Sequence, residues 1–227
     1  MVQTPIIVIS SDKKNTGKIT VALNLAAALW NDGYQVKLFA PNNEKIQDFI
    51  EKRKLMNRQC NAELPMPQII NDIDAENNTE KDVIIAVVPS DRNQEYANVF
   101  NKAHTLISLG CKKEDFDWSF AHPYINLIWQ SKKNAAARGI KYLNWIVVQN
   151  KLQNEKDNLT SQLQPLAKQF GFRLAEPLWF RNAYKYAENG YCSADMAKYR
   201  QIFKMSMDDV YARREILNLT DDLWKRK

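Results

Sequence analysis

The sequence predicts an α/β protein with a doubly wound, mostly parallel sheet flanked by helices. Three observations predict this class. Short apolar segments alternate along the chain with segments of helical periodicity, which is the pattern of repeated βαβ units. Residues 82–88 form a run that is continuously apolar after Asp82, as strands buried on both faces of a parallel sheet are. The first strand and helix enclose a polar loop that ends in Gly17-Lys18.

The predicted strands are short runs rich in Val, Ile and Leu that end at polar residues, glycine or proline. They lie at residues 5–10, 36–40, 82–88, 105–109 and 143–148, with a short edge strand at residues 172–174. Pro41 ends the second strand because proline cannot donate a backbone hydrogen bond to a sheet. We expect the strands to be mainly parallel because helical segments separate them.

The predicted helices carry apolar side chains three and four residues apart, so one face of each can be buried. They lie at residues 18–30, 45–57, 95–103, 159–170 and 207–224, and residues 111–138 are expected to be irregular to helical. Gly33 ends the first helix, as a glycine just past a helix C-terminus does. In the last helix we expect Val210, Ile216 and Leu217 to point inward.

Length and composition indicate a single domain over residues 1–227, with the C-terminal helices packed on it. The sequence has no apolar run of about 18 residues and no signal peptide at its start, so we expect a cytoplasmic protein without a membrane span. The three cysteines are odd in number and far apart, which favours reduced thiols. His104 and His122 have no cysteine or carboxylate at ligand spacing, and no metal site is predicted.

The loop at residues 11–17 has the features of a phosphate-binding loop. In such a loop, backbone N–H groups and the N-terminus of the next helix surround phosphate, and a lysine reaches its outer oxygens. Lys18 stands at the lysine position. Ile19 stands where a Ser or Thr hydroxyl normally binds Mg²⁺, and it has no oxygen for a hard cation. Thr20 comes one residue too late, since adjacent helical residues point in different directions.

These loop residues resemble the deviant Walker A motif of the ParA/MinD family of P-loop ATPases, most closely that of the MipZ proteins. The same resemblance extends over most of the chain, and its most specific segment runs from Asn144 to Arg173. It implies that Lys13 is the signature lysine, which reaches the partner's nucleotide across a homodimer. The expected ATP- or ADP-binding residues are Lys13, Lys14, Asn15, Thr16, Gly17, Lys18, Ile19 and Thr20, with Asn150 at the adenine ring.

The chain departs from the family at three positions that serve Mg²⁺ and hydrolysis. Ile19 replaces the hydroxyl residue. The second strand runs into Ala40-Pro41-Asn42, where the family has aspartate. Val87 replaces the acidic residue of the Walker B strand. Mg²⁺ binding is therefore doubtful, and Asp91 is the alternative ligand. We expect little or no ATP hydrolysis, because phosphoryl transfer depends on charge neutralisation and positioning.

The formal net charge of +6 permits binding to DNA or to an acidic partner. The resemblance implies non-specific DNA binding by a dimer, as well as ParB-like and FtsZ-like protein partners. By the same resemblance the candidate DNA contacts are Arg173, Arg181, Lys185 and Arg200, and the alternative basic patch contains Lys132 and Lys133.

Three functional hypotheses follow. The first is a regulator of division-site placement or chromosome segregation that acts by nucleotide-linked or constitutive binding. The second is a pseudo-ATPase scaffold without nucleotide, in which Ile19 and Val87 pack against each other. The third is an active ATPase with unusual metal ligands, either Asp91 or Asp115 with Asp117.

Overall fold

A computed structural model describes residues 4–41, 43–74, 82–140, 143–199 and 202–224. Their strands form one seven-stranded sheet of order β3-β2-β4-β1-β5-β6-β7, and every pairing in it is parallel. The strands are β1 (Ile6–Ser10), β2 (Gln35–Phe39), β3 (Gln68–Ile70), β4 (Asp82–Val87), β5 (Thr105–Gly110), β6 (Asn144–Gln149) and β7 (Arg173–Leu174). The predicted doubly wound α/β class is confirmed.

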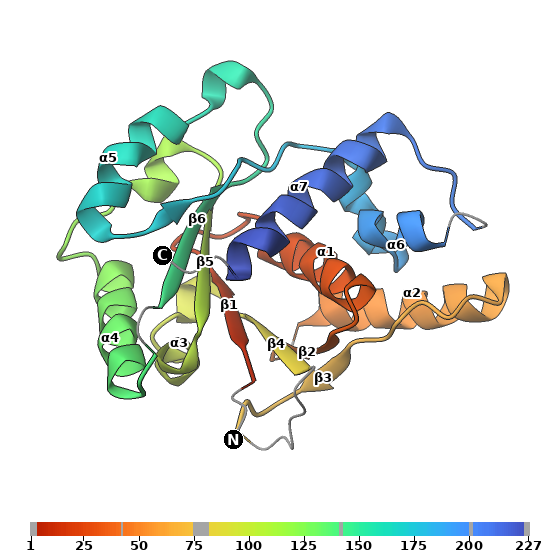
Figure 1. The fold of residues 1–227 in the computed structure, drawn as a ribbon, viewed down its shortest axis with the longest axis horizontal. Helices are drawn as coiled ribbons and strands as arrows, with labels where there is room; N and C mark the ends of the chain where they lie inside the picture. The colour runs from red at the N-terminus through yellow and green to blue at the C-terminus, as the bar shows by residue number, and fades with distance from the viewer. Residues whose placement is uncertain (1–3, 42, 75–81, 141–142, 200–201, 225–227) are drawn as a thin grey trace.

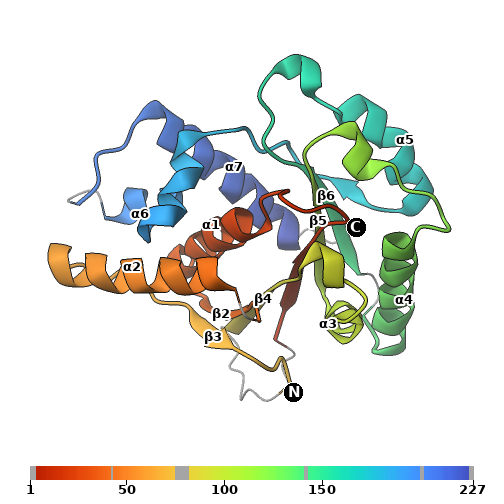
Figure 2. The same cartoon turned by 180° about the vertical axis from the view of Figure 1, so that it is seen from behind.

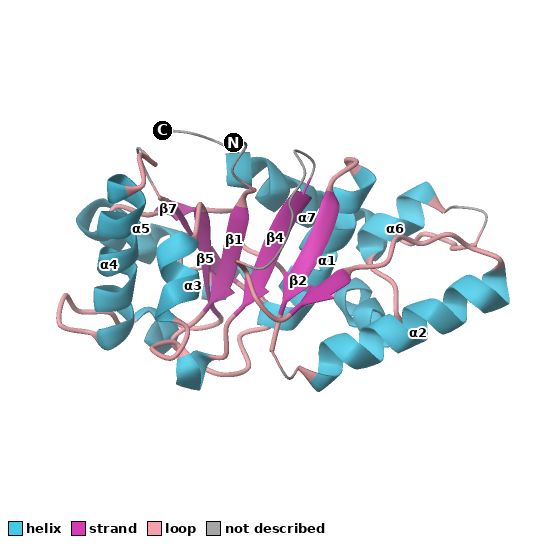
Figure 3. Cartoon of the chain, turned by 90° about the horizontal axis from the view of Figure 1, so that it is seen from below, coloured by secondary structure: helices cyan, strands magenta, loops and turns pink. Residues whose placement is uncertain are grey.

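Helices cover both faces of the sheet (Figures 1 and 3). One face is covered by α1 (Lys18–Asn31), α2 (Glu44–Cys60), α6 (Ser193–Lys198) and α7 (Met207–Trp224). The other face is covered by α3 (Ala97–Lys102), α4 (Pro123–Ala137) and α5 (Thr160–Phe170). Alternation along β1 explains the two layers, since Ile7 and Ile9 pack on the first side and Ile6 and Val8 on the second.

The register of the central strands places their carboxyl ends side by side. Ile9 of β1 pairs with Val87 of β4 and with Ile107 of β5. The loop from β1 to α1 therefore leaves the sheet between the ends of its two neighbours. Figure 2 shows this loop at the end of the sheet next to β5 and β6. This edge is where open α/β sheets bind ligands.

A buried polar network lies under that loop. The hydroxyl of Tyr124 on α4 is 2.7 Å from the hydroxyls of both Ser10 and Ser108. Trp145 on β6 donates its indole N–H to Ser108 at 2.9 Å. Burial raises the pKa of Tyr124 to about 12, so the phenol stays protonated and the network stays neutral. The network ties the end of β1 to α4.

A buried ion pair fixes α2 to the α6 side of the molecule. Arg53 on α2 is fully buried and makes two 2.8 Å hydrogen bonds to the carboxylate of Asp195. Its other N–H groups donate to the carbonyl oxygens of Pro65 and Gly190. Its guanidinium also lies 5.2 Å from the ring centre of Trp30 on α1. These contacts satisfy a charge that would otherwise be costly to bury.

The structure corrects one expectation from the sequence, adds one strand that was not predicted and defines one region more closely. Val210 does not point inward but is 45% exposed, whereas Ile216 on the same helix is buried and Leu217 packs partly on the core. Residues 68–70, where no strand was predicted, form strand β3 by pairing with β2. Within residues 111–138, the part from Pro123 to Ala137 is a regular helix, α4, which starts at a proline in its first turn.

Candidate functional site

The loop between β1 and α1 has the backbone of an anion-binding loop. Asn15 and Gly17 both have left-handed conformations, with φ of 62° and 88°. Such a conformation turns successive N–H groups toward one concave side. Within the described part of the chain, the N–H groups of residues 14, 15 and 17–20 donate no hydrogen bond. The Thr16 hydroxyl, on a residue that is 1% exposed, likewise has no described partner. These donors are available to an anion.

Residues from the end of β6 hold the loop from the side. The amide of Asn150 donates to the carbonyl oxygen of Thr16 at 2.7 Å, and the ammonium of Lys151 donates to that of Asn15 at 2.6 Å. A Cβ atom on Gly17 would lie 2.4 Å from the Asn150 amide nitrogen, so this close approach requires glycine. The loop carbonyls are thus bound, while its N–H groups are not.

Lys18 points to the centre of the site. Its ammonium donates to the hydroxyls of Ser11 at 2.8 Å and Ser90 at 2.9 Å. Burial lowers the pKa of Lys18 to about 8, and the nearby Asp91 carboxylate opposes this shift. The amide of Asn93 ties the same region together by donating to the carbonyl oxygens of Ser11 and Ser90. A partly buried lysine with only neutral acceptors favours a bound anion, because an anion would restore its full charge.

The other two loop lysines have carboxylate partners. Lys13, at the signature-lysine position, lies 3.0 Å from Asp12, whose carboxylate is also 3.6 Å from Nε2 of His122. Lys14 lies 2.9 Å from Asp91, and this contact lowers the pKa of that carboxyl. Both lysine side chains are more than half exposed. They remain free to move toward a ligand.

The side chains at this edge do not fit Mg²⁺. Ile19 is partly buried and packs against the apolar cluster that contains Val87, so the two positions that would supply oxygen ligands carry apolar side chains with apolar contacts. The Asp115 carboxylate accepts the N–H groups of Cys111 and Lys112. Among the described residues, no group of three or more His, Cys, Asp or Glu side chains could hold a metal ion. In nucleotide sites Mg²⁺ is bound through one or two protein oxygens together with phosphates and water, and the two positions for those oxygens hold Ile19 and Val87 instead.

Asn150 has a structural role in this conformation. It is 5% exposed; its amide nitrogen binds Thr16, and its side-chain oxygen accepts the N–H of Lys151. Contact with adenine would have to use a rearranged side chain. The adenine-reading role therefore stays a prediction.

The candidate DNA contacts differ in how free their charges are. Arg173 binds Asn144 and lies 3.6 Å from Asp222, and Arg181 pairs with Glu215 and Asp208. Lys185 is exposed and lies over the ring of Phe180. Arg200 lies outside the described residues. In the alternative patch, Lys132 donates to the carbonyl oxygens of Phe170 and Gly171, and Lys133 is exposed. Their role in DNA binding stays a prediction.

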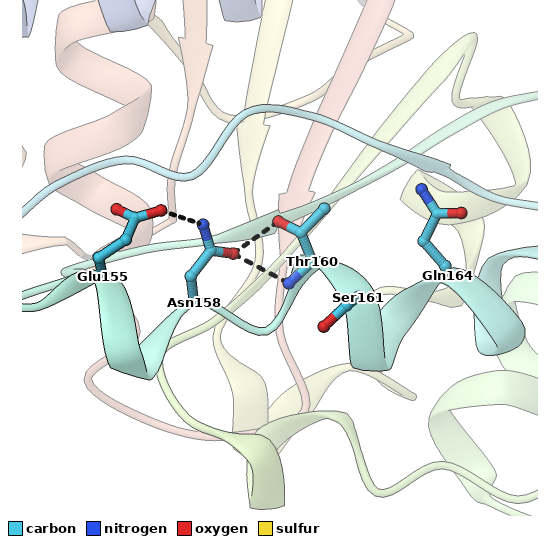
Figure 4. Close-up of a pocket in the computed structure, with 5 residues that line it drawn as sticks. All are labelled: Glu155, Asn158, Thr160, Ser161 and Gln164. Carbon is cyan, nitrogen blue, oxygen red and sulfur yellow. Dashed lines mark hydrogen bonds between the residues drawn. The ribbon is translucent and has the colours of Figure 1, made fainter.

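The structure adds residues that sequence reasoning did not select. Ser11, Ser90, Asn93 and Lys151 all contact the loop or its lysine. Ser11 follows β1, Ser90 and Asn93 follow the neighbouring strand β4, and Lys151 follows β6, which β5 separates from β1. This position after the end of a strand was the available signal. A separate open hollow of about 520 Å³ lies at the start of α5 and is lined by Glu155, Asn158, Thr160, Ser161 and Gln164 (Figure 4). Its Asn158 side chain is bonded to its neighbours Glu155 and Thr160.

The parallel sheet with a phosphate-type loop after its first strand defines a P-loop protein of the ParA/MinD type. The family model described as ATPase MipZ matches residues 5–107 and 112–225, and the chain belongs to this family. No curated protein matches the chain. None of the helices in the described ranges is long and apolar enough to cross a bilayer.

Solved structures of similar fold agree with this class. The MinD cell division protein of Aquifex aeolicus is 13% identical with a TM-score of 0.59, and the match covers 99% of this chain and 98% of that one. A protein of Borrelia burgdorferi B31 described as a plasmid partition protein, bound to AMPPNP, is 14% identical with a TM-score of 0.56, covering 95% and 98%. Cyanothece McdA in an ATP complex is 13% identical with a TM-score of 0.55, covering 100% and 99%.

Proposed function

We propose that this protein is a MipZ/ParA-like regulator of division-site placement or chromosome segregation that acts by binding, with little or no ATP hydrolysis. The observation that carries the proposal is the phosphate loop itself. It keeps unbonded N–H groups and the lysine pair Lys13 and Lys18, while Val87 lies in the apolar core and Ile19 packs against that core. Such a site can bind phosphate but lacks the groups that promote its transfer.

In this proposal ATP or ADP binds to residues 13–20 and links two copies of the chain. Lys13 is half-exposed, so its side chain can leave Asp12 and reach a partner. The expected macromolecular partners are ParB-like and FtsZ-like proteins, and a dimer can also bind DNA non-specifically through its basic residues. DNA binding of this kind weakens steeply with salt, because it is driven by phosphate contacts and counterion release.

A second candidate is a protein-interaction scaffold that binds no nucleotide. The closed polar contacts of Lys18 favour it, since Ser11 and Ser90 already satisfy this ammonium. An active ATPase with unusual ligands has less support. Asp91 is bound to Lys14, and Asp115 is bound to backbone N–H groups.

The test measures nucleotide binding, oligomeric state and phosphate release in the same samples. We expect ATP to bind without Mg²⁺, to shift the chain toward dimers in analytical ultracentrifugation, and to be released intact. Lys18→Ala should abolish binding, Lys13→Ala should retain binding but lose dimers, and Lys52→Ala, an exposed lysine on α2, should change neither. Phosphate release that depends on Mg²⁺ would instead support an active ATPase with unusual metal ligands. Absence of binding at millimolar ATP would support a scaffold that binds no nucleotide.

A further inference from the structure

The charge balance of the phosphate loop is unusual for a nucleotide site. A triphosphate carries several negative charges, which metal ions neutralise in a complete P-loop site. Here the positions for oxygen ligands are apolar, so the neutralising charge must come from the protein. Three lysines of the loop, Lys13, Lys14 and Lys18, supply it within six residues.

Residues just after β4 bring two of these lysines together. Ser90 accepts a hydrogen bond from Lys18 at 2.9 Å, and its neighbour Asp91 lies 2.9 Å from Lys14. Asp91 also acts on the charge of Lys18 electrostatically. Lys14 and Lys18 thus belong to one cationic cluster, beside the unbonded N–H groups of the loop.

A metal ligand needs a carboxylate oxygen that is free to bind the ion, whereas the Asp91 carboxylate is bound to a cation of the protein. The carboxylate is bound to Lys14, and the next residue is Arg92. A divalent cation arriving here would meet two ammonium groups of the loop, and like charges at such distances repel. The side chains of Lys14 and Asp91 are 69% and 51% exposed, and pairs this exposed are weak. A stronger anion can therefore replace the carboxylate.

We infer that the loop binds a polyphosphate without a metal ion, with Lys14 supplying the positive charge and Asp91 acting as the counter-ion that the phosphate displaces. This inference rests on the proposed function, because it concerns the same site. It extends that function by naming the ligand form: the metal-free anion of a nucleoside triphosphate, recognised through its phosphates.

Two opposite substitutions test the roles of Lys14 and Asp91. Calorimetric titration with ATP, and separately with inorganic tripolyphosphate, is done in EDTA. Asp91→Asn removes the competing carboxylate and should tighten binding about three- to tenfold. Lys14→Gln should weaken binding about tenfold for both probes. Asp48→Asn and Lys52→Gln, which change the same charges in an exposed pair on α2, should leave affinity unchanged.

Adding Mg²⁺ distinguishes Asp91 as a displaced counter-ion from Asp91 as a metal ligand, because the two roles predict opposite changes in ATP affinity. In the inferred mode, Mg²⁺ leaves ATP affinity unchanged or weakens it, because it neutralises the phosphate that Lys14 must bind. If Mg²⁺ tightens binding and Asp91→Asn removes this gain, Asp91 is a metal ligand and the inference is wrong. Wild-type binding that neither Lys14→Gln nor Asp91→Asn alters overturns the inference alone. Absence of binding in every variant overturns the nucleotide link of the proposed function as well.

Discussion

The buried pair of Arg53 and Asp195 gives the most quantitative prediction about stability. Both side chains are essentially inaccessible, at 0% and 1% exposure, and two 2.8 Å hydrogen bonds join them. Arg53→Met keeps most of the side-chain volume but removes the charge. It leaves the Asp195 carboxylate buried, with the N–H of Cys192 as its remaining hydrogen-bond donor among those described. It also removes the donors of two carbonyl oxygens.

Breaking a buried ion pair by removing one partner costs about 3–5 kcal/mol of unfolding free energy. For a chain of this size each kcal/mol shifts Tm by about 2–4 °C, so Arg53→Met should lower Tm by about 6–20 °C. Urea unfolding followed by circular dichroism gives the free energy, and calorimetry gives Tm. Lys52→Met, the neighbouring residue in an exposed pair with Asp48, should stay within about 0.5 kcal/mol of wild type.

The double variant Arg53→Met, Asp195→Asn decides whether the uncompensated charge causes the loss. Removing the second charge should restore part of the stability, so the double variant should be more stable than the sum of the two single changes predicts. If Arg53→Met lowers the free energy of unfolding by less than about 1 kcal/mol, or if the effects of the two substitutions simply add, then an uncompensated buried charge on Asp195 does not cause the loss of stability.

Three further predictions concern the loop and the pH dependence of the molecule. Gly17→Ala should abolish ATP binding measured by calorimetry, because a φ of 88° is strained for alanine and the added Cβ would displace Asn150. Gly33→Ala is the control, since Gly33 has a φ of 89° but no atom within 4 Å of an added Cβ. This control should lower Tm through backbone strain alone and keep binding. ATP affinity should fall as pH rises past about 8, where unliganded Lys18 loses its proton. Lys18→Arg should remove this fall, because arginine keeps its charge. A wild-type affinity that stays constant from pH 7 to 9.5 would contradict the role of Lys18 in binding phosphate. Burial lowers the pKa of His104 from 6.5 to about 4, so between these pH values the unfolded chain binds a proton that the folded chain does not. The free energy of unfolding should therefore fall by about 1–2 kcal/mol as pH drops from 6.5 to 4, given that this group is only partly buried. Urea unfolding of His104→Asn should show a smaller fall.

Local patterns predicted the central sheet well. The strands β1, β4, β5 and β6 are mostly apolar runs, which have few alternatives to burial between two layers. The loop was visible because Gly17 and Lys18 lie next to each other before a helix. Strand β3 was missed because three residues show no periodicity, and only pairing with β2 makes them a strand.

The partners of the loop could not be predicted from local patterns, because they arrive through the pairing of distant strands. Ser90 and Asn93 come from beyond β4, and Lys151 comes from beyond β6. Val210 was misassigned because apolar side chains on a surface helix do not all face the core. The exposed stripe of α7 also includes Met207 and Tyr211, so periodicity alone did not show which face is covered.

The anchoring of the phosphate loop by Asn150 and Lys151 has a consequence for how the protein would report that a ligand is present. Because these side chains hold the loop carbonyls as part of the fold, entropy of ordering this backbone is lost during folding rather than at binding. A ligand then has little main-chain movement left to cause. Its arrival would be communicated by side chains that change partners at the surface, so a second protein could sense it through charge without any large change in shape.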